Sequence, residues 1–125
     1  MAGLRGRRVA ETVREHLSDT LQKRLGDPRL AGLVITDVQL PDDLGVAHVL
    51  VRLIDDDGDL DRRRRLLSAL KRVRARVRRS LAPKLRLKRV PELYFSYDDG
   101  QDHAARVAEL LREIELERVV DDEDE

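Results

Sequence analysis

The chain of 125 residues contains no cysteine and no tryptophan, and its only aromatic residues are one Phe and two Tyr. Without cysteine it can form no disulfide framework and perform no thiol chemistry, which suits a reducing compartment. Its first residues lack the apolar segment of a signal peptide, and nowhere do about eighteen apolar residues follow one another as a membrane span requires. We therefore expect a cytoplasmic protein with no membrane partner.

Patterns typical of catalytic or metal sites are missing as well. No two of His16, His48 and His103 are spaced as zinc ligands on one helix would be. None of the seven glycines begins the Gly-x-x-x-x-Gly-Lys loop that binds phosphate. We expect each histidine to lie at the surface or at its boundary. The sequence thus favours a binding protein without metal or cofactor over an enzyme.

The two signs of charge are segregated, although 25 basic and 25 acidic residues give a net charge of zero. Acidic residues are concentrated in 55–61 and 121–125. Residues 62–89 hold more than half of the Lys and Arg residues and no Asp or Glu. The same segment predicts an amphipathic helix, because apolar residues recur at intervals of three and four. They are Leu66, Leu70, Val73, Val77 and Leu81.

The outer face of this helix would be almost entirely basic. Each pair of like charges one turn apart destabilises a helix by roughly a few tenths of a kcal/mol. The nucleotide bias of a GC-rich genome would explain why Arg stands in place of Lys, but not why residues 62–89 contain no acidic residue. We expect a polyanion to compensate the charge. Nucleic acid is favoured over a membrane surface, because the apolar face is needed for the core and carries no Trp or Phe. The residues expected to bind the polyanion are Arg64, Arg65, Lys71, Arg72, Arg76, Arg78, Arg79, Arg86, Lys88 and Arg89.

The segments before this helix predict another helix and two strands. Apolar residues at every fourth position indicate a helix over 5–25, which Gly26 and Pro28 should end. Alternating, β-branched residues over 33–40 and 46–53 indicate an antiparallel hairpin. The buried faces should consist of Val9, Val13, Leu17 and Leu21 in the helix and of Ala47, Val49, Val51 and Leu53 in the second strand.

The loop from Asp55 to Asp59 supports two interpretations. Its carboxylates could cap the basic helix, where the helix dipole favours negative charge. Asp at alternate positions could also indicate a calcium loop, but Leu60 and Leu66 stand where an EF-hand has its Gly and its final Glu. We favour the helix-capping loop.

The basic helix should end or kink close to Leu81, because Pro83 follows. A third strand is predicted over 91–97, and it contains all three aromatic residues of the chain. We expect Phe95 and Tyr97 to pack in the core. The alternative is a surface on which unpaired bases stack.

A last helix is predicted over 102–118, and residues 119–125, which are acidic from Asp121 onward, should form a disordered tail. The order helix, two strands, long helix, strand, helix predicts a single α+β domain over 1–118, with helices covering one face of a small sheet. The apolar side of the last helix would consist of Val107, Leu110, Leu111 and Ile114.

Several short segments occur in an order and at a spacing that one known family shares. They are Arg8-Val9, Asp27-Pro28-Arg29-Leu30, Val34-Ile35-Thr36-Asp37-Val38, Asp43-Leu44 with Ala47 and Val49, Leu85-Arg86-Leu87, Pro91-Glu92-Leu93-Tyr94-Phe95 and Asp98. On these residues the chain resembles the ribosome-binding factor A family over about residues 5–114. Each match is weak alone, whereas the ordered set is specific.

The resemblance implies a KH-like domain of the second topological type, in which a kinked helix pair replaces the Gly-x-x-Gly loop of other KH domains. The family's Ala-x-Gly kink corresponds here to Val73, Arg74 and Ala75, which depart from it at both ends. The resemblance also implies a monomeric assembly factor, without chemistry of its own, that binds free or immature small (30S) ribosomal subunits. It would contact the 5′-terminal helix and decoding region of 16S ribosomal RNA and assist late rRNA processing.

Binding of this kind would be electrostatic, with basic residues of the helix and of 85–89 on the phosphates of a structured RNA. Five or six phosphate contacts would lower the logarithm of the affinity by roughly 4 to 5 for each tenfold rise in salt. The acidic tail could compete with RNA for this face. Two other classes stay open, a sequence-specific DNA-binding protein and a charge-patterned protein-interaction module.

Overall fold

A computed structural model of the chain describes residues 4–23, 27–41, 45–87, 89–100 and 109–116. The α+β class predicted from the sequence is confirmed. Residues 109–116 form a further helical segment near the end of the chain. The main elements are α1 (Leu4–Lys23), the 3-10 turn η1 (Pro28–Leu30), β1 (Leu33–Gln39), β2 (Val46–Leu53), α2 (Leu60–Leu85) and β3 (Glu92–Tyr97).

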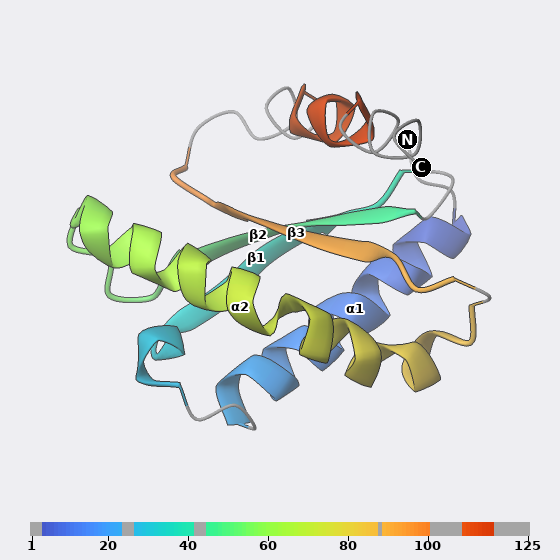
Figure 1. Cartoon of the computed structure of the whole chain (residues 1–125), viewed down its shortest axis with the longest axis horizontal. Helices are drawn as coiled ribbons and strands as arrows, with labels where there is room; N and C mark the ends of the chain where they lie inside the picture. Colours follow the sequence, from blue (N-terminus) through green and yellow to red (C-terminus); the bar gives the residue numbers. More distant parts are fainter. Residues whose placement is uncertain (1–3, 24–26, 42–44, 88, 101–108, 117–125) are drawn as a thin grey trace.

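The three strands form one sheet in the order β1-β2-β3. β1 and β2 pair antiparallel, which confirms the predicted hairpin, whereas β2 and β3 pair parallel. A parallel pair needs a connection that crosses back over the sheet, and here α2 is that connection. Both α1 and α2 lie on the same side of the sheet (Figure 1). β3, the strand that comes directly after α2 in the chain, is thus an edge strand of the sheet.

A β-bulge sets the buried face of β1. The register with β2 shifts between Ile35 and Asp37, which leaves Thr36 as the extra residue. Strict alternation would turn Val38 away from the side of Leu33 and Ile35. Because of the bulge, all three apolar side chains are buried in the same core.

The core lies between the sheet and the two long helices. The apolar faces predicted for α1 and for β2 are confirmed, since every residue of both sets is buried. The face predicted for α2 is also confirmed, with Val73 packed at its margin and partly buried. The completely or almost completely buried residues of α2 are Leu66, Ala69, Leu70, Val77 and Leu81.

The predicted helix-capping loop is confirmed at the start of α2. Asp59 is the N-cap residue, and its carboxylate accepts hydrogen bonds from the backbone N–H groups of Asp61 at 3.0 Å and Arg62 at 3.3 Å. These bonds satisfy two of the amide groups that a helix start leaves without intrahelical partners. The carboxylate of Asp61 also lies in the first turn, where the helix dipole favours it.

The prediction that α2 ends near Leu81 is wrong, because the helix continues through Pro83 to Leu85. The alternative, a kink near Leu81, stays a prediction. Pro83 lies in the last turn, so its missing N–H removes a single intrahelical bond near the end of the helix. Leu85 is 9% exposed and belongs to the core, which favours extending the helix that far. Arg86 then ends it in a left-handed conformation, with φ 53°.

The expectation that helices cover only one face of the sheet is also wrong. Residues 109–116 lie on the side of the sheet opposite α1 and α2 (Figure 1). Val46, His48 and Leu50 of β2 point away from the main core by alternation, and each is at most 3% exposed. β2 is therefore buried on both faces along this stretch, as expected for a central strand covered on both sides.

His48 corrects the expectation of a surface histidine, because its side chain is fully buried. Its Nε2 lies 2.6 Å from the hydroxyl oxygen of Ser96. Burial lowers the pKa of His48, since the charged imidazolium would lose its hydration, although nearby Asp37 opposes the shift. His16 is half-buried, with Nε2 2.9 Å from the Ser80 hydroxyl of α2.

Several sequence predictions concern residues outside the described ranges. They include the end of the first helix at Gly26, the histidine at 103, Val107 and most of the predicted last helix, and the acidic tail. Of the predicted apolar side of that helix, Leu110, Leu111 and Ile114 are described and half-buried. None of the described helices combines the length and the hydropathy needed to cross a membrane.

Candidate nucleic-acid interface

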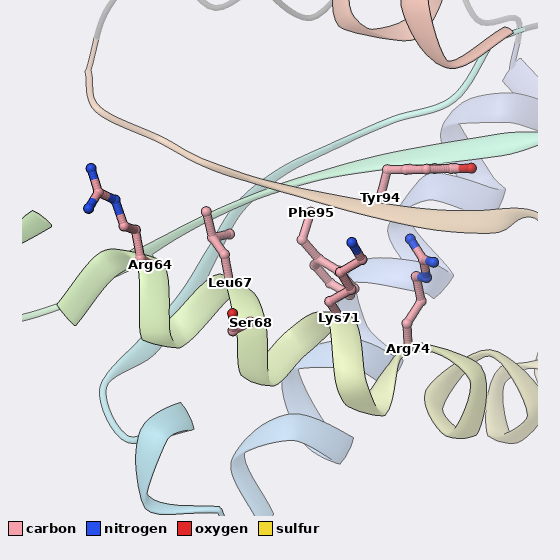
Figure 2. A pocket seen from close by; sticks show the side chains of 7 residues that line it. All are labelled: Arg64, Leu67, Ser68, Lys71, Arg74, Tyr94 and Phe95. Carbon is pink, nitrogen blue, oxygen red and sulfur yellow. The ribbon is translucent and has the colours of Figure 1, made fainter. Parts of the chain in front are cut away.

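The surface of α2 that faces away from the core carries two rows of basic residues. At about 100° per residue, Arg65, Arg72, Arg76 and Arg79 fall on the side toward α1 and η1. Arg64, Lys71 and Arg74 fall on the side toward β3, where Figure 2 shows them beside the strand. The small, exposed residues Ser68 and Ala75 lie between the rows.

Most cations of these rows have no acidic partner within the described ranges. In the part of the chain that the structure describes, Lys71, Arg72, Arg76 and Arg79 are exposed and form no ion pair. Asp27, paired with Arg29 at 2.8 Å, is close enough to Arg72 for a small electrostatic effect. The hydrogen bonds from Arg29 are the main cause that lowers the pKa of Asp27. The middle of α2 therefore presents uncompensated positive charge to solvent.

The Asp-rich loop neutralises only the first turn of α2. Arg62 pairs with Asp55 at 2.7 Å, and hydrogen bonding to Arg62 lowers the pKa of that carboxyl. Arg64 lies 3.5 Å from Asp61, and both side chains are 76% exposed. An exposed pair of this length contributes little, so Arg64 stays available to another anion.

Arg63 belongs to a polar cluster that joins α2 to the end of the sheet. Its guanidinium lies 4.7 Å from the centre of the Tyr97 ring and 2.9 Å from a carboxylate oxygen of Asp56. The Tyr97 hydroxyl accepts a hydrogen bond from the backbone N–H of Leu53 at 3.0 Å and donates one to Asp56. That donation, with one from the Gly58 N–H, lowers the pKa of Asp56 to about 2, whereas burial is the main cause that raises the pKa of Tyr97.

The core packing predicted for Phe95 and Tyr97 is confirmed, since both are partly buried against the core cluster. Tyr97 also has a structural role that the sequence did not indicate. Its hydroxyl donates to Asp56 of the acidic loop, and Asp56 in turn pairs with Arg63 at the start of α2. Tyr97 is consequently a structural residue of the fold.

Arg78 has a structural position that the sequence did not predict. Its half-buried guanidinium donates to the backbone carbonyl of Val90, from Nη2 at 2.6 Å and from Nε at 3.2 Å. Nε also lies 3.1 Å from the carbonyl oxygen of Pro91. These bonds fix the segment that leads from α2 into β3. We therefore assign Arg78 to the fold, although it was predicted to bind the polyanion.

The remaining predicted residues either follow the end of α2 or belong to the expected kink. Arg86 and Arg89 are exposed, and Lys88 lies outside the described residues. Val73, Arg74 and Ala75 lie within the continuous helix α2, with Ala75 exposed and Arg74 half-buried. The kink expected at these three residues stays a prediction.

An open pocket lies between the β3-side row of α2 and β3 itself. Leu67 and Phe95 line it and pack against the core, so its inner surface is apolar. Arg74 places its guanidinium 5.2 Å from the centre of the Tyr94 ring, and Figure 2 shows this pair at one end of the pocket. The lining residues are Arg64, Leu67, Ser68, Lys71, Arg74, Tyr94 and Phe95.

The sequence did not single out Leu67 or Ser68 as site residues, and it named Arg74 only as part of the expected kink. Leu67 and Arg74 fall at the border between the apolar and basic faces of α2, where periodicity does not tell a core residue from a pocket residue. The described ranges bring no three potential metal ligands together. Taken together, cations beside aromatic and apolar side chains suit an anionic ligand with flat apolar parts.

The mixed three-stranded sheet, with a basic helix connecting its parallel strands, defines a KH-like α+β domain. The sequence model of one family, ribosome-binding factor A, matches residues 5–111. The chain therefore belongs to the ribosome-binding factor A family.

Individual members of the family support this assignment. Ribosome-binding factor A of Sorangium cellulosum is 46% identical over 110 residues, which cover 88% of each chain. The crystal structure of ribosome-binding factor A from Thermus thermophilus is similar with a TM-score of 0.62 and 27% identity, over 74% of this chain and 94% of that one. A homology model of the Thermus thermophilus factor, fitted into a cryo-electron-microscopy map of its 30S complex, gives a TM-score of 0.55 at 26% identity over 82% of this chain and 99% of that one.

Proposed function

We propose that this protein is a ribosome assembly factor that binds the small (30S) ribosomal subunit through the exposed basic surface of α2. Membership of the ribosome-binding factor A family supports the assignment. The fitted 30S complex of the Thermus thermophilus relative supports the small subunit as the partner. The DNA-binding and protein-module alternatives have no comparable support.

The uncompensated charge of α2 is the observation that carries the proposal. Arg72, Arg76 and Arg79 are exposed at successive turns of the helix and have no acidic partner among the described residues. RNA phosphates would supply the missing negative charge and would release bound counterions on contact. Contacts of this type fix the position of the protein on the RNA rather than select a sequence.

We further propose that the bound RNA is 16S rRNA near its 5′-terminal helix and the decoding region. By holding a maturing segment in one arrangement, a cytoplasmic, monomeric factor would assist late rRNA processing without chemistry of its own. The family resemblance supports these finer statements. The proposed contacts are Arg64, Arg65, Lys71, Arg72, Arg76, Arg79, Arg86, Lys88 and Arg89.

Co-sedimentation with purified ribosomal particles tests the proposal. The wild-type protein should sediment with free 30S subunits and not with 50S subunits or joined ribosomes. The double variant Arg72→Glu/Arg76→Glu should lose this association, because it places two negative charges where phosphates would bind. Circular dichroism should show that the variant keeps its fold, since both side chains are exposed.

A matched control changes the same amount of charge on another surface. Arg52 is exposed and alternates along β2 with the core residues Val51 and Leu53, so it lies on the sheet face opposite α2. Arg112 is exposed in the segment 109–116. The variant Arg52→Glu/Arg112→Glu should still sediment with 30S subunits. Equal loss in both double variants would contradict α2 as the binding surface, and binding of the wild type to no particle would contradict the function itself.

A further inference from the structure

We propose that Arg29 of turn η1 binds the RNA phosphate next to the one at Arg72, and that Asp27 holds the Arg29 side chain in the orientation for this contact. The inference rests on the proposed function, because it takes the phosphates of ribosomal RNA as the ligand. It extends the binding surface from one helix to two elements. Contacts along α2 alone would let the protein rotate about the helix axis, and a contact on η1 would restrict that rotation.

The fold brings Arg29 to the side of α2 that carries Arg72. Turn η1 packs against α2 (Figure 1), and Leu30 at its end is buried in the core. Hydrogen bonds from Arg29 are the main cause that lowers the pKa of the Asp27 carboxyl, and the charge of Arg72 adds a smaller effect in the same direction. Arg29 and Arg72 therefore lie on either side of one carboxylate, although they belong to different elements.

The guanidinium of Arg29 is held from one side and is open on the other. Its Nε donates to Oδ1 of Asp27 at 3.1 Å and its Nη2 donates to Oδ2 at 2.8 Å, which is the parallel pairing that fixes an arginine most firmly. Among the described residues, Nη1 donates to no acceptor. The side chain of Arg29 is 39% exposed and that of Asp27 only 17%. The carboxylate is thus the inner partner, and the arginine offers its remaining N–H groups to solvent.

The fold itself does not require the side chain of Arg29. The cap of η1 is a hydrogen bond of 2.9 Å from the backbone N–H of Arg29 to Asp27 Oδ1, which other residues at position 29 would also supply. An exposed ion pair adds little to stability. Its effect on binding is larger, because an arginine that is already oriented loses less side-chain entropy when it meets a phosphate.

The salt dependence of binding to 30S subunits tests the contact. Arg29→Gln should weaken binding roughly tenfold at low salt. It should also reduce the slope of log affinity against log salt by about 0.7–0.9, the contribution of one phosphate contact. Arg52→Gln is the matched control, because Arg52 is exposed on the opposite face of the sheet, and it should keep the wild-type affinity and slope. Circular dichroism should show the same fold for both variants.

The direction of the effect at Asp27 tells positioning from simple neutralisation of charge. Asp27→Asn keeps an oxygen that can cap the turn and removes a negative charge from a surface that binds an anion. If Asp27 only neutralised Arg29, this variant would bind 30S subunits more tightly. We expect weaker binding, because Arg29 loses its fixed orientation. In the Arg29→Gln background the same change should cause no further weakening, because no arginine is left to position.

The outcomes separate this inference from the proposed function. Wild-type affinity and slope in Arg29→Gln, or an equal loss in Arg52→Gln, would overturn the contact, while loss of binding in Arg72→Glu/Arg76→Glu would keep the basic surface of α2. Asp27→Asn would overturn the positioning role if it bound as well as the wild type, or if it weakened binding equally with and without Arg29. Absence of wild-type binding to 30S subunits would overturn both proposals.

Discussion

Removing the hydroxyl of Tyr97 should destabilise the fold measurably. This hydroxyl accepts the backbone N–H of Leu53 at 3.0 Å and donates to Asp56, which also pairs with Arg63. Tyr97→Phe keeps the ring against which Arg63 packs, so the substitution removes the two hydrogen bonds and little else. Leu53 is 2% exposed, and its N–H would be left without this acceptor in a buried position.

The expected cost follows from that unpaired donor. Leaving a buried backbone donor unsatisfied costs about 1–3 kcal/mol, whereas a well-solvated hydrogen bond contributes about 1 kcal/mol or less. We therefore expect the free energy of unfolding of Tyr97→Phe to fall by about 1–3 kcal/mol. The denaturant dependence should stay the same, since the surface exposed on unfolding hardly changes.

Urea unfolding followed by circular dichroism measures this difference, with Tyr94→Phe as the matched control. The Tyr94 hydroxyl donates to Glu92, two residues away on the same strand, at 3.3 Å. Glu92 and Tyr94 are half-buried, and water can replace this bond. The control should therefore lose less stability than Tyr97→Phe. Equal losses in the two variants, or no loss in Tyr97→Phe, would refute a structural role for the cluster.

Three further substitutions test other parts of the fold by urea unfolding. Asp56→Asn should remove a contribution that is present above the ordinary carboxyl pKa of 3.8 and is lost as the pH falls toward about 2, where the folded protein protonates Asp56. The gap in stability between wild type and variant should thus narrow from pH 5 to about pH 2, and a constant gap would contradict the assignment. Asp59→Ala should cost about 0.5–2 kcal/mol through loss of the α2 cap; an unchanged midpoint would count against the cap. Gly32→Ala should cost about 1–2 kcal/mol because Gly32 has φ +81°, and its new methyl group would lie 3.3 Å from Asp55; a neutral effect would show that the turn can change its conformation.

Local periodicity predicted most of the secondary structure. Apolar residues recur at every fourth position in α1 and at every second position in β2 because of the geometry of a single helix or strand. These patterns are therefore visible in the sequence without knowledge of the elements against which α1 and β2 pack. The acid-free stretch of α2 was equally visible, because charge segregation does not depend on the fold. The bulge at Thr36 was not predicted, although it explains why the alternation in β1 is only approximate.

Features that depend on contacts between distant segments could not be predicted. The parallel pairing of β3 with β2 sets which side chains face α2, and the sequence order alone leaves it open. The pocket follows from this pairing, as does the position of Arg78 against the carbonyl of Val90. The extension of α2 beyond Pro83 also depends on burial of Leu85 in the core, which outweighs the local signal to stop.

The salt dependence of binding to 30S subunits tests most directly whether Arg72, Arg76 and Arg79 contact phosphates. The affinity of the wild type and of Arg72→Gln/Arg76→Gln/Arg79→Gln would be measured over a range of salt concentrations. Each phosphate contact contributes roughly 0.7–0.9 to the slope of log affinity against log salt. We predict that the variant binds more weakly and that its slope is smaller by about 2 to 3. Equal slopes for the two proteins would contradict the account, because the three arginines would then neutralise no phosphate.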